Sequence, residues 1–252
     1  MNKKIFKYIL FILLNIVLII STCILISSCN KIDKATTITK IKEQEKQIDE
    51  QNKNIEKGEE IMLPEPQQKS NISLEEALNN RRSKRQFQAR DLKLEDISQI
   101  LWAAQGITEM STGFRTAPSA GALYPLELFV VKSDGFFNYI SKGHKLKKLS
   151  SSDLRSELMK ASLFQKSISE APVDIVITAI YERTTLKYGN RGIRYVHMEA
   201  GHTCQNILLE ATALGLGAVP IGAFSDTNVQ KVLNLPEDYI PLYVIPVGYI
   251  KY

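Results

Sequence analysis

Four cations stand within five residues at 81–85, where the chain reads Arg-Arg-Ser-Lys-Arg. Guanidinium groups match phosphate oxygens with paired hydrogen bonds, and the Ser83 hydroxyl adds a neutral donor. A phosphate group carries about −1.5 to −2 charges near neutral pH, so two or three cations are a suitable complement. The run therefore predicts a site for the phosphate of a mononucleotide, although a short basic run is also typical of a solvated surface turn.

Two predicted helices flank this basic run. Ser73 followed by Glu76 is typical of a capping box, and the helix that it starts is expected to continue to Asn80. From Leu94 to Gln105, apolar residues recur with the three- and four-residue spacing of one helix face. The basic run is therefore expected in the connection between two helices.

A stretch of small residues around Gly121 follows the second helix, and such residues let the backbone approach a flat ligand closely. Beyond it, the patterns predict strands at 127–132, 173–180, 217–223 and 242–250, and helices at 152–160 and 199–214. Because helices and strands are mixed without a regular βαβ alternation, the predicted fold class is α+β rather than a doubly wound sheet.

The composition is that of a globular protein, with 44% hydrophobic and 23% charged residues among 252. The net charge is +5, and Lys3, Lys4 and Lys7 supply three of these charges in an amino-terminal stretch without acidic residues. The remaining +2 gives no electrostatic reason to expect a nucleic-acid partner. The three histidines lack Cys or carboxylate neighbours at ligand spacing, so no metal site is predicted.

The first 28 residues resemble a secretory signal. Nearly continuous apolar sequence begins at Phe6 and ends in Ile26-Ser27-Ser28-Cys29, which resembles a bacterial lipobox. Residues 1–28 are therefore predicted to be a lipoprotein signal peptide, and Cys29 is predicted to be lipidated. An uncleaved transmembrane helix is the alternative, since about 20 apolar residues can span a bilayer. In both cases the domain is expected at the cell membrane, facing away from the cytoplasm.

Residues 29–60 are polar, and Ile41, Ile48 and Ile55 recur there at every seventh position. A stable coiled coil needs two apolar positions per heptad, so a flexible or partly helical tether is predicted, with a weak dimerising helix as the alternative. The folded domain is expected to cover residues 61–252. Within it, Cys204 lies on an apolar helix and is expected to be a buried, inert thiol.

Three blocks of this domain occur in order, namely Arg81–Arg85, Pro118–Pro125 and Leu214–Phe224. Together they resemble the nitroreductase family of FMN-dependent oxidoreductases, and Tyr188–Gly192 and Gly201–Asn206 add a resemblance to its SagB-type dehydrogenase branch. The resemblance covers about residues 61–252. It implies a mixed central sheet flanked by helices, and a homodimer with two FMN sites in its interface.

The resemblance also implies a place at FMN for each block. The first block would bind the phosphate, with Arg82 close to the ring, through Arg81, Ser83 and Arg85. The second would pack on the isoalloxazine ring, in many members from the opposite subunit, through Pro118, Ser119, Ala120 and Gly121. The third would run along the flavin edge near N5 through Pro220, Ile221, Gly222 and Ala223.

The sequence departs from many family members at two places. Ala122 stands where many nitroreductases carry Asn in the second block. The chain also stops at Tyr252, whereas many relatives continue to a Lys or Arg that completes the phosphate site. Lys251 is the candidate replacement.

Lys187 and Tyr188 resemble a Lys-Tyr pair that is implicated, in SagB-type azoline oxidases, in removing a proton from the ring being oxidised. A desolvated lysine near a flavin can act as a base and a tyrosine can relay a proton, so both are candidate catalytic residues. The alternative is a surface lysine beside a packing tyrosine. His202 is expected to be a packing residue at the dimer interface.

The sequence therefore predicts a membrane-anchored, FMN-dependent oxidoreductase that passes electrons to a small-molecule acceptor, such as a nitroaromatic compound or a quinone. A SagB-type peptide azoline dehydrogenase and a non-catalytic flavin-binding lipoprotein are the alternatives. The sequence contains no glycine-rich dinucleotide fingerprint, and nicotinamide cofactors are cytoplasmic. A membrane quinol is thus a candidate electron donor for a domain outside the cytoplasm.

Overall fold

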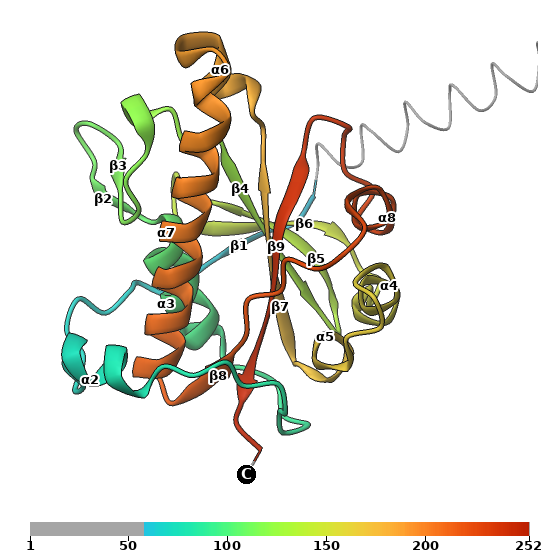
Figure 1. Ribbon diagram of the computed structural model, residues 1–252. Coiled ribbons are helices and arrows are strands. Elements are labelled where there is room, and N and C mark those ends of the chain that lie inside the picture. Colours follow the sequence, from blue (N-terminus) through green and yellow to red (C-terminus); the bar gives the residue numbers. More distant parts are fainter. Residues whose placement is uncertain (1–57, 252) are drawn as a thin grey trace, which may run out of the picture. The chain divides into compact units, whose positions relative to one another are not determined.

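The computed structural model of the protein describes residues 58–251 (Figure 1). The predicted signal peptide, the predicted lipidation site Cys29 and the tether up to residue 57 lie outside the described residues. Among the described residues, no helix is both long and apolar enough to cross a membrane.

The domain is built on a seven-stranded sheet with the strand order β1-β6-β5-β4-β7-β9-β8. Its strands are β1 (Glu60–Met62), β4 (Leu126–Lys132), β5 (Gly135–Ile140), β6 (Lys145–Ser150), β7 (Val173–Ala179), β8 (Leu216–Ala218) and β9 (Ile240–Tyr249). Neighbouring strands are antiparallel, and one parallel bridge joins Ser83 to Ala218 at the β8 edge. A separate hairpin pairs β2 (Ile107–Glu109) with β3 (Phe114–Arg115). The predicted α+β class with a mixed sheet is confirmed. The parallel pairing in this sheet is the bridge between Ser83 and Ala218.

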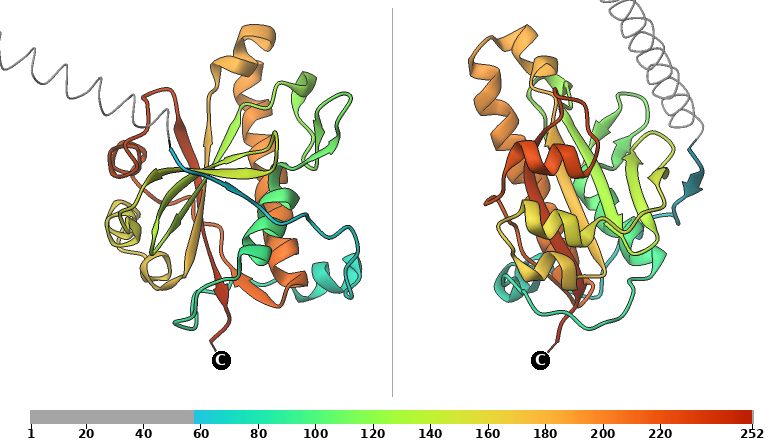
Figure 2. Two further views of the ribbon diagram at one scale, coloured as in Figure 1. Left: turned by 180° about the vertical axis from the view of Figure 1, so that it is seen from behind. Right: turned by 90° about the vertical axis from the view of Figure 1, so that its right-hand side faces the viewer.

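Helices cover both faces of the sheet (Figures 1 and 2). They are α2 (Leu74–Asn80), α3 (Leu94–Gln105), α4 (Arg155–Ala161), α5 (Lys166–Glu170), α6 (Glu182–Tyr188), α7 (Arg191–Ala213) and α8 (Asp226–Val232). α3 and α7 share one buried core with Ile175 of β7, whereas α4, α5 and α8 share a second core with Val176. Every residue of β7 is buried, because successive strand side chains point to opposite faces and both faces are covered.

Several predicted elements are confirmed. α3 begins at Leu94 and ends at Gln105, as its apolar spacing predicts. The capping box at the start of α2 is present: Glu76 N–H donates to Ser73 Oγ at 3.1 Å, and Ser73 N–H donates to Glu76 Oε2 at 2.9 Å. Cys204 is buried on α7, and burial raises the pKa of its thiol to about 12, as expected for an inert thiol.

Other elements differ from their predicted bounds. α7 begins at Arg191 rather than at Glu199, because its first turns are mostly exposed and show no continuous apolar stripe. The strand predicted at 217–223 is shorter, since β8 ends at Ala218 and Ile221 forms only an isolated bridge to β9. The β5–β6 hairpin was not predicted, because β6 reads KLKKLS and lacks the β-branched and aromatic residues typical of strands.

The segment that leads into the domain is fixed by side chains of α3 and of the β5–β6 hairpin. Ser98 Oγ donates to the Pro64 carbonyl at 2.5 Å and lies 2.6 Å from His144 Nε2. Tyr139 Oη lies 2.9 Å from His144 Nδ1. Because Ser98 uses its hydrogen on Pro64, His144 donates from Nε2 and accepts at Nδ1, which is the neutral form. Burial lowers the pKa of His144, which also favours this neutral form.

Candidate functional site

The basic run leaves α2 and joins the edge of the sheet. Arg81 caps the end of α2, where its backbone N–H donates to the last turn of the helix. The Lys84 N–H then donates to the Ala218 carbonyl at 3.0 Å. Two blocks that are far apart in the sequence, 81–85 and 214–224, therefore lie side by side.

The cations of this run are at least partly exposed, and none has an acidic partner among residues 58–251. Arg82 and Arg85 are exposed, whereas the other two cations are half-buried. Within residues 58–251, no acidic side chain forms an ion pair with any of the four. Arg82 Nη1 instead donates to the backbone carbonyls of Asn79 and Arg81, both at 2.8 Å. Uncompensated guanidinium groups at this density fit an anionic group such as a phosphate.

The close approach of the two blocks depends on Gly217. A Cβ at this position would lie 2.8 Å from Lys84 Cβ and 3.0 Å from Ile250 Cγ1. Carbon atoms in favourable contact stand about 3.5–4.0 Å apart, so a side chain here would push the basic run away from β8. The close packing of the basic run against β8 therefore requires glycine at position 217.

The third block, Leu214–Phe224, has an exposed stretch of backbone next to the basic run. Ile221 is buried and exchanges two backbone hydrogen bonds of 2.9 Å with Val244. Pro220 is half-buried, whereas Gly222 and Ala223 are exposed. A Cβ at Gly222 would meet no atom within 4 Å. A flat ligand can therefore approach the backbone at this point.

The second block lies with the candidate catalytic pair. Gly121 has a φ of +64°, which favours glycine, and a Cβ there would lie 2.7 Å from Tyr188 Oη and 2.9 Å from Lys187 Nζ. Ser119 Oγ accepts the Tyr124 N–H at 2.9 Å and so fixes the turn. The structure thus brings the side-chain ends of α6 to the loop 118–121.

These contacts define two half-sites in one chain. The basic half-site consists of residues 81–85 and 216–223, and the loop half-site consists of residues 118–121 with Lys187 and Tyr188. Within residues 58–251, no hydrogen bond or ion pair joins one half-site to the other. In a single chain, the residues that the resemblance places on two sides of one flavin are therefore not bonded to one another.

A buried polar network lies beneath the loop half-site, and sequence reasoning missed it. Glu199 of α7 is only 2% exposed, and burial raises the pKa of its carboxyl group to about 7, although Ser119 and Gln105 oppose the shift. Gln105 Nε2 donates to Thr203 Oγ1 at 2.8 Å, and Arg115 Nη1 donates to Gln105 Oε1 at 3.2 Å. The signal available in the sequence is a carboxylate on the otherwise apolar stripe of a helix.

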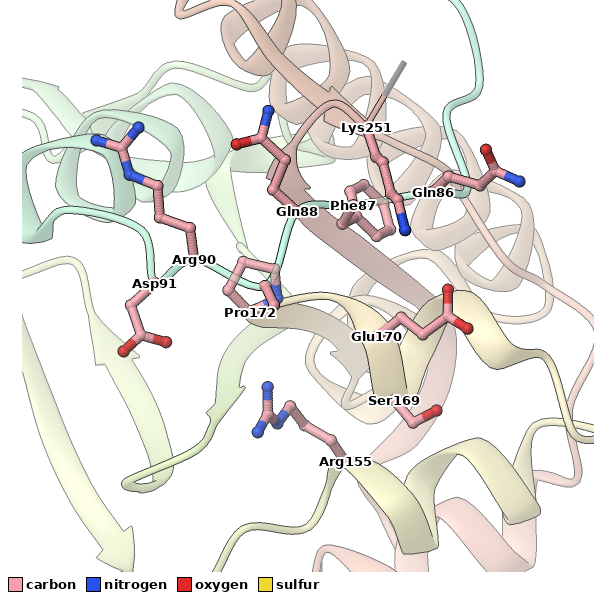
Figure 3. Close-up of a pocket in the computed structure, with 11 residues that line it drawn as sticks. Gln86, Phe87, Gln88, Arg90, Asp91, Arg155, Ser169, Glu170, Pro172 and Lys251 are labelled. Carbon is pink, nitrogen blue, oxygen red and sulfur yellow. The ribbon is translucent and has the colours of Figure 1, made fainter.

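A cavity of about 910 Å³ lies beside the segment that follows the basic run (Figure 3). Lys251 and Arg155 line it, whereas Ser83 and the cations of 81–85 do not. Arg155 is already paired with Asp153, at 2.6 and 2.9 Å. The Lys251 N–H donates to the Gln86 carbonyl at 3.1 Å, so the backbone of the candidate replacement is close to the basic run while its side chain lines this other cavity.

Two further residues singled out in the sequence lie on the loop after Gly121 and on α7. Ala122 follows Gly121 with a φ of +54°, and His202 is exposed on α7 in the single chain. Within the described part of the chain, no three His, Cys, Asp or Glu side chains lie close enough to hold a metal ion.

The chain is similar to known proteins along most of the described domain. The Nitroreductase family model matches residues 78–249. A protein of Methanocaldococcus jannaschii named as a nitroreductase is 45% identical over 195 residues, which cover 75% of this chain and 96% of that protein. The microcin B17-processing protein McbC of Escherichia coli is 26% identical over 165 residues, 61% of either protein. The crystal structure of a Ralstonia eutropha protein named as a nitroreductase matches with a TM-score of 0.71 and 30% identity, over 77% of this chain and 90% of that one.

Proposed function

Because the chain belongs to the nitroreductase family, we propose that it is a membrane-anchored, FMN-dependent oxidoreductase that passes electrons to a small-molecule acceptor. The acceptor would be a nitroaromatic compound or a quinone. The observation that carries this proposal is the basic half-site, where four cations without an acidic partner among residues 58–251 stand against an open backbone edge. This combination suits the charged tail and the flat ring of one mononucleotide.

Each part of the basic half-site has a role under this proposal. FMN supplies the hydride chemistry when bound. Arg81, Ser83 and Arg85 would hold its phosphate, and Arg82 would stabilise negative charge near the ring. The Gly222 N–H donates to no backbone carbonyl within residues 58–251, so it is free to donate to the ring edge.

The functional unit would be a homodimer, in which each flavin lies between the basic half-site of one copy and the loop half-site of the other. Large apolar side chains are exposed on α6 and α7, namely Leu186 (80%), Ile193 (44%) and Met198 (52%). α6 and the adjoining end of α7 project beyond the sheet in Figure 1. Exposed apolar side chains gathered on projecting helices are typical of a protein interface. Sedimentation as a monomer at micromolar concentration would contradict the dimer.

The membrane anchor would be a lipid on Cys29, which would place the domain outside the cytoplasm. The support is the lipobox-like sequence Ile26–Cys29. Cys29→Ala should abolish incorporation of a fatty-acid label and release the protein from the membrane fraction, whereas Cys23→Ala should change neither. Label that persists in Cys29→Ala would move the anchor elsewhere.

The central test is the absorption spectrum of the purified full-length protein. We expect flavin bands, FMN in the released material, bleaching by dithionite, and recovery of the bands when a quinone or nitroarene is added. Arg81→Ala should weaken FMN binding about tenfold or more, because a hydrogen bond to a charged group contributes about 1.5–3 kcal/mol. Lys93→Ala is the control, since Lys93 is exposed and makes no side-chain bond at the start of α3. A protein that stays colourless after FMN is added would refute the proposal. A protein that binds FMN but is not reoxidised by either acceptor would favour the non-catalytic flavin-binding lipoprotein.

A second candidate function is the oxidation of an azoline ring in a peptide. It is supported by the contact of Lys187 and Tyr188 with Gly121, and by the similarity to the microcin B17-processing protein. The ring would lose a hydride to the flavin and a proton to Lys187, with Tyr188 as a relay. Lys187→Met and Tyr188→Phe should then abolish oxidation of a thiazoline-containing peptide while the reduced protein still reduces a quinone. Equal effects on both reactions would exclude this function.

A further inference from the structure

The turn between α4 and α5 presents two adjacent large apolar side chains to solvent. Leu163 is 64% exposed and Phe164 is 70% exposed. Both have a left-handed backbone, with φ of +55° and +59°. This conformation is unfavourable for any residue with a Cβ. An apolar side chain that stays exposed to water also contributes little hydrophobic free energy to folding. The positive φ angles and the exposed apolar side chains are both unfavourable, and the folding of the domain explains neither. Unfavourable local structure of this kind is typical of functional sites.

The turn is held in place by defined contacts. Phe164 N–H donates to the Met159 carbonyl at 3.0 Å, and Gln165 N–H donates to the Ser162 carbonyl at 3.3 Å. Ser162 itself is completely buried at the end of α4. The two apolar side chains are thus presented by a fixed backbone.

The same turn is bonded to the open edge of the basic half-site. Gln165 Nε2 donates to the Ala223 carbonyl at 2.9 Å, and the Ser225 N–H donates to the Ala161 carbonyl at 3.0 Å. Ala223 belongs to the exposed segment that would run along the flavin edge. Leu163 and Phe164 therefore directly precede Gln165, the residue whose side chain is bonded to this segment.

We propose that Leu163 and Phe164 form an apolar wall that binds the electron acceptor beside the flavin, and that they select flat apolar acceptors such as quinones. This inference rests on the proposed function. An aromatic ring and a branched aliphatic side chain suit the face of a quinone, whereas a small hydrophilic acceptor would gain nothing from them. The quinone would take a hydride from the reduced flavin and a proton from water, and would leave as the hydroquinone while the flavin returns to its oxidised form.

The double variant Leu163→Gly/Phe164→Gly separates this role from folding. Glycine adopts a positive φ without steric cost, so removing both side chains relaxes the turn, and the unfolding temperature should not decrease. The full-length protein would be loaded with FMN, reduced with one equivalent of dithionite, and mixed rapidly with menadione or with ferricyanide. We expect the second-order rate constant for menadione to fall about tenfold, with the ferricyanide rate and FMN retention unchanged.

Met62→Gly provides the matched control. Met62 is 65% exposed on β1, at the sheet edge opposite to β8, and its loss should change neither rate. An unchanged menadione rate in the double variant would overturn the inference, and so would an equal fall with ferricyanide. A wild-type protein that fails to hold FMN would instead overturn the proposed function, which the double variant by itself does not test.

Discussion

The carboxyl group of Glu199 gives a direct test of the buried network beneath the loop half-site. Its pKa is raised from 4.5 to about 7 because burial disfavours the charged form. The folded protein therefore keeps a proton that the unfolded chain releases between pH 4.5 and 7, and the free energy of unfolding decreases as pH rises through this range. The full decrease is about 3 kcal/mol, present above the folded-state pKa and absent below pH 4.5.

Glu199→Gln removes the charge and keeps the shape, and its amide can donate and accept beside Ser119 and Gln105. We expect the variant to exceed the wild type in unfolding free energy by about 3 kcal/mol at pH ~8, and to equal it at pH ~4. Urea unfolding of the full-length protein across this range measures the difference. Glu157→Gln is the control, because Glu157 is exposed and its 3.7 Å pair with Lys160 contributes little.

Other titrating groups are present in both proteins, so their effects cancel in this comparison. Parallel stability curves for wild type and Glu199→Gln would refute the reasoning, because they would mean that the Glu199 carboxyl group loses its proton at the same pH in the folded and unfolded chains. The side chain of Glu199 would then be solvated in the folded protein rather than buried beneath the loop 118–121.

Three further predictions concern single residues. Asp174 is fully buried without a hydrogen-bond partner in the described chain, and burial raises its pKa well above 3.8. The free energy of unfolding should therefore fall by about 1.4 kcal/mol per pH unit above pH ~4, and Asp174→Asn should remove this fall. An unchanged pH dependence of the unfolding free energy in urea would contradict the prediction. His144 has a lowered pKa, so stability should fall as pH drops below 6.5, and His144→Asn, which tolerates the positive φ, should flatten that fall in the same assay. Gly217→Ala should weaken FMN binding about tenfold in equilibrium dialysis, whereas Gly201→Ala, with open space around its Cβ position, should not; equal affinities would remove the role of Gly217.

The elements that the sequence predicts well are those in which local pattern and burial agree. Ile97, Ile100 and Leu101 recur at helical spacing and are all buried against the sheet, so the bounds of α3 follow from them. The first turns of α7 bury little and β6 is rich in lysine, so neither carries a periodic signal of its own. Their structure depends on partners that are distant in the sequence.

The candidate site can be proposed from residue types in the sequence, but its geometry cannot. The basic run and the small residues suggest a phosphate and a flat ring, yet nothing local indicates that Lys84 bonds to Ala218 or that Tyr188 meets Gly121. Both contacts depend on sheet register and helix packing. Glu199 was missed because a single carboxylate in a helix gives no sign of its burial until the packing partners are known.

The division into two half-sites leads to a last prediction, which tests where one complete site is assembled. Arg81→Ala damages the basic half-site, and Gly121→Val damages the loop half-site, because a Cβ there would lie 2.7 Å from Tyr188 Oη. Each homodimer then has two damaged sites. A mixed dimer has one site that carries both substitutions and one that carries neither, so random mixing of subunits should restore FMN binding in about a quarter of all sites. If one chain builds a whole site, every site in the mixture keeps one defect, and no binding returns.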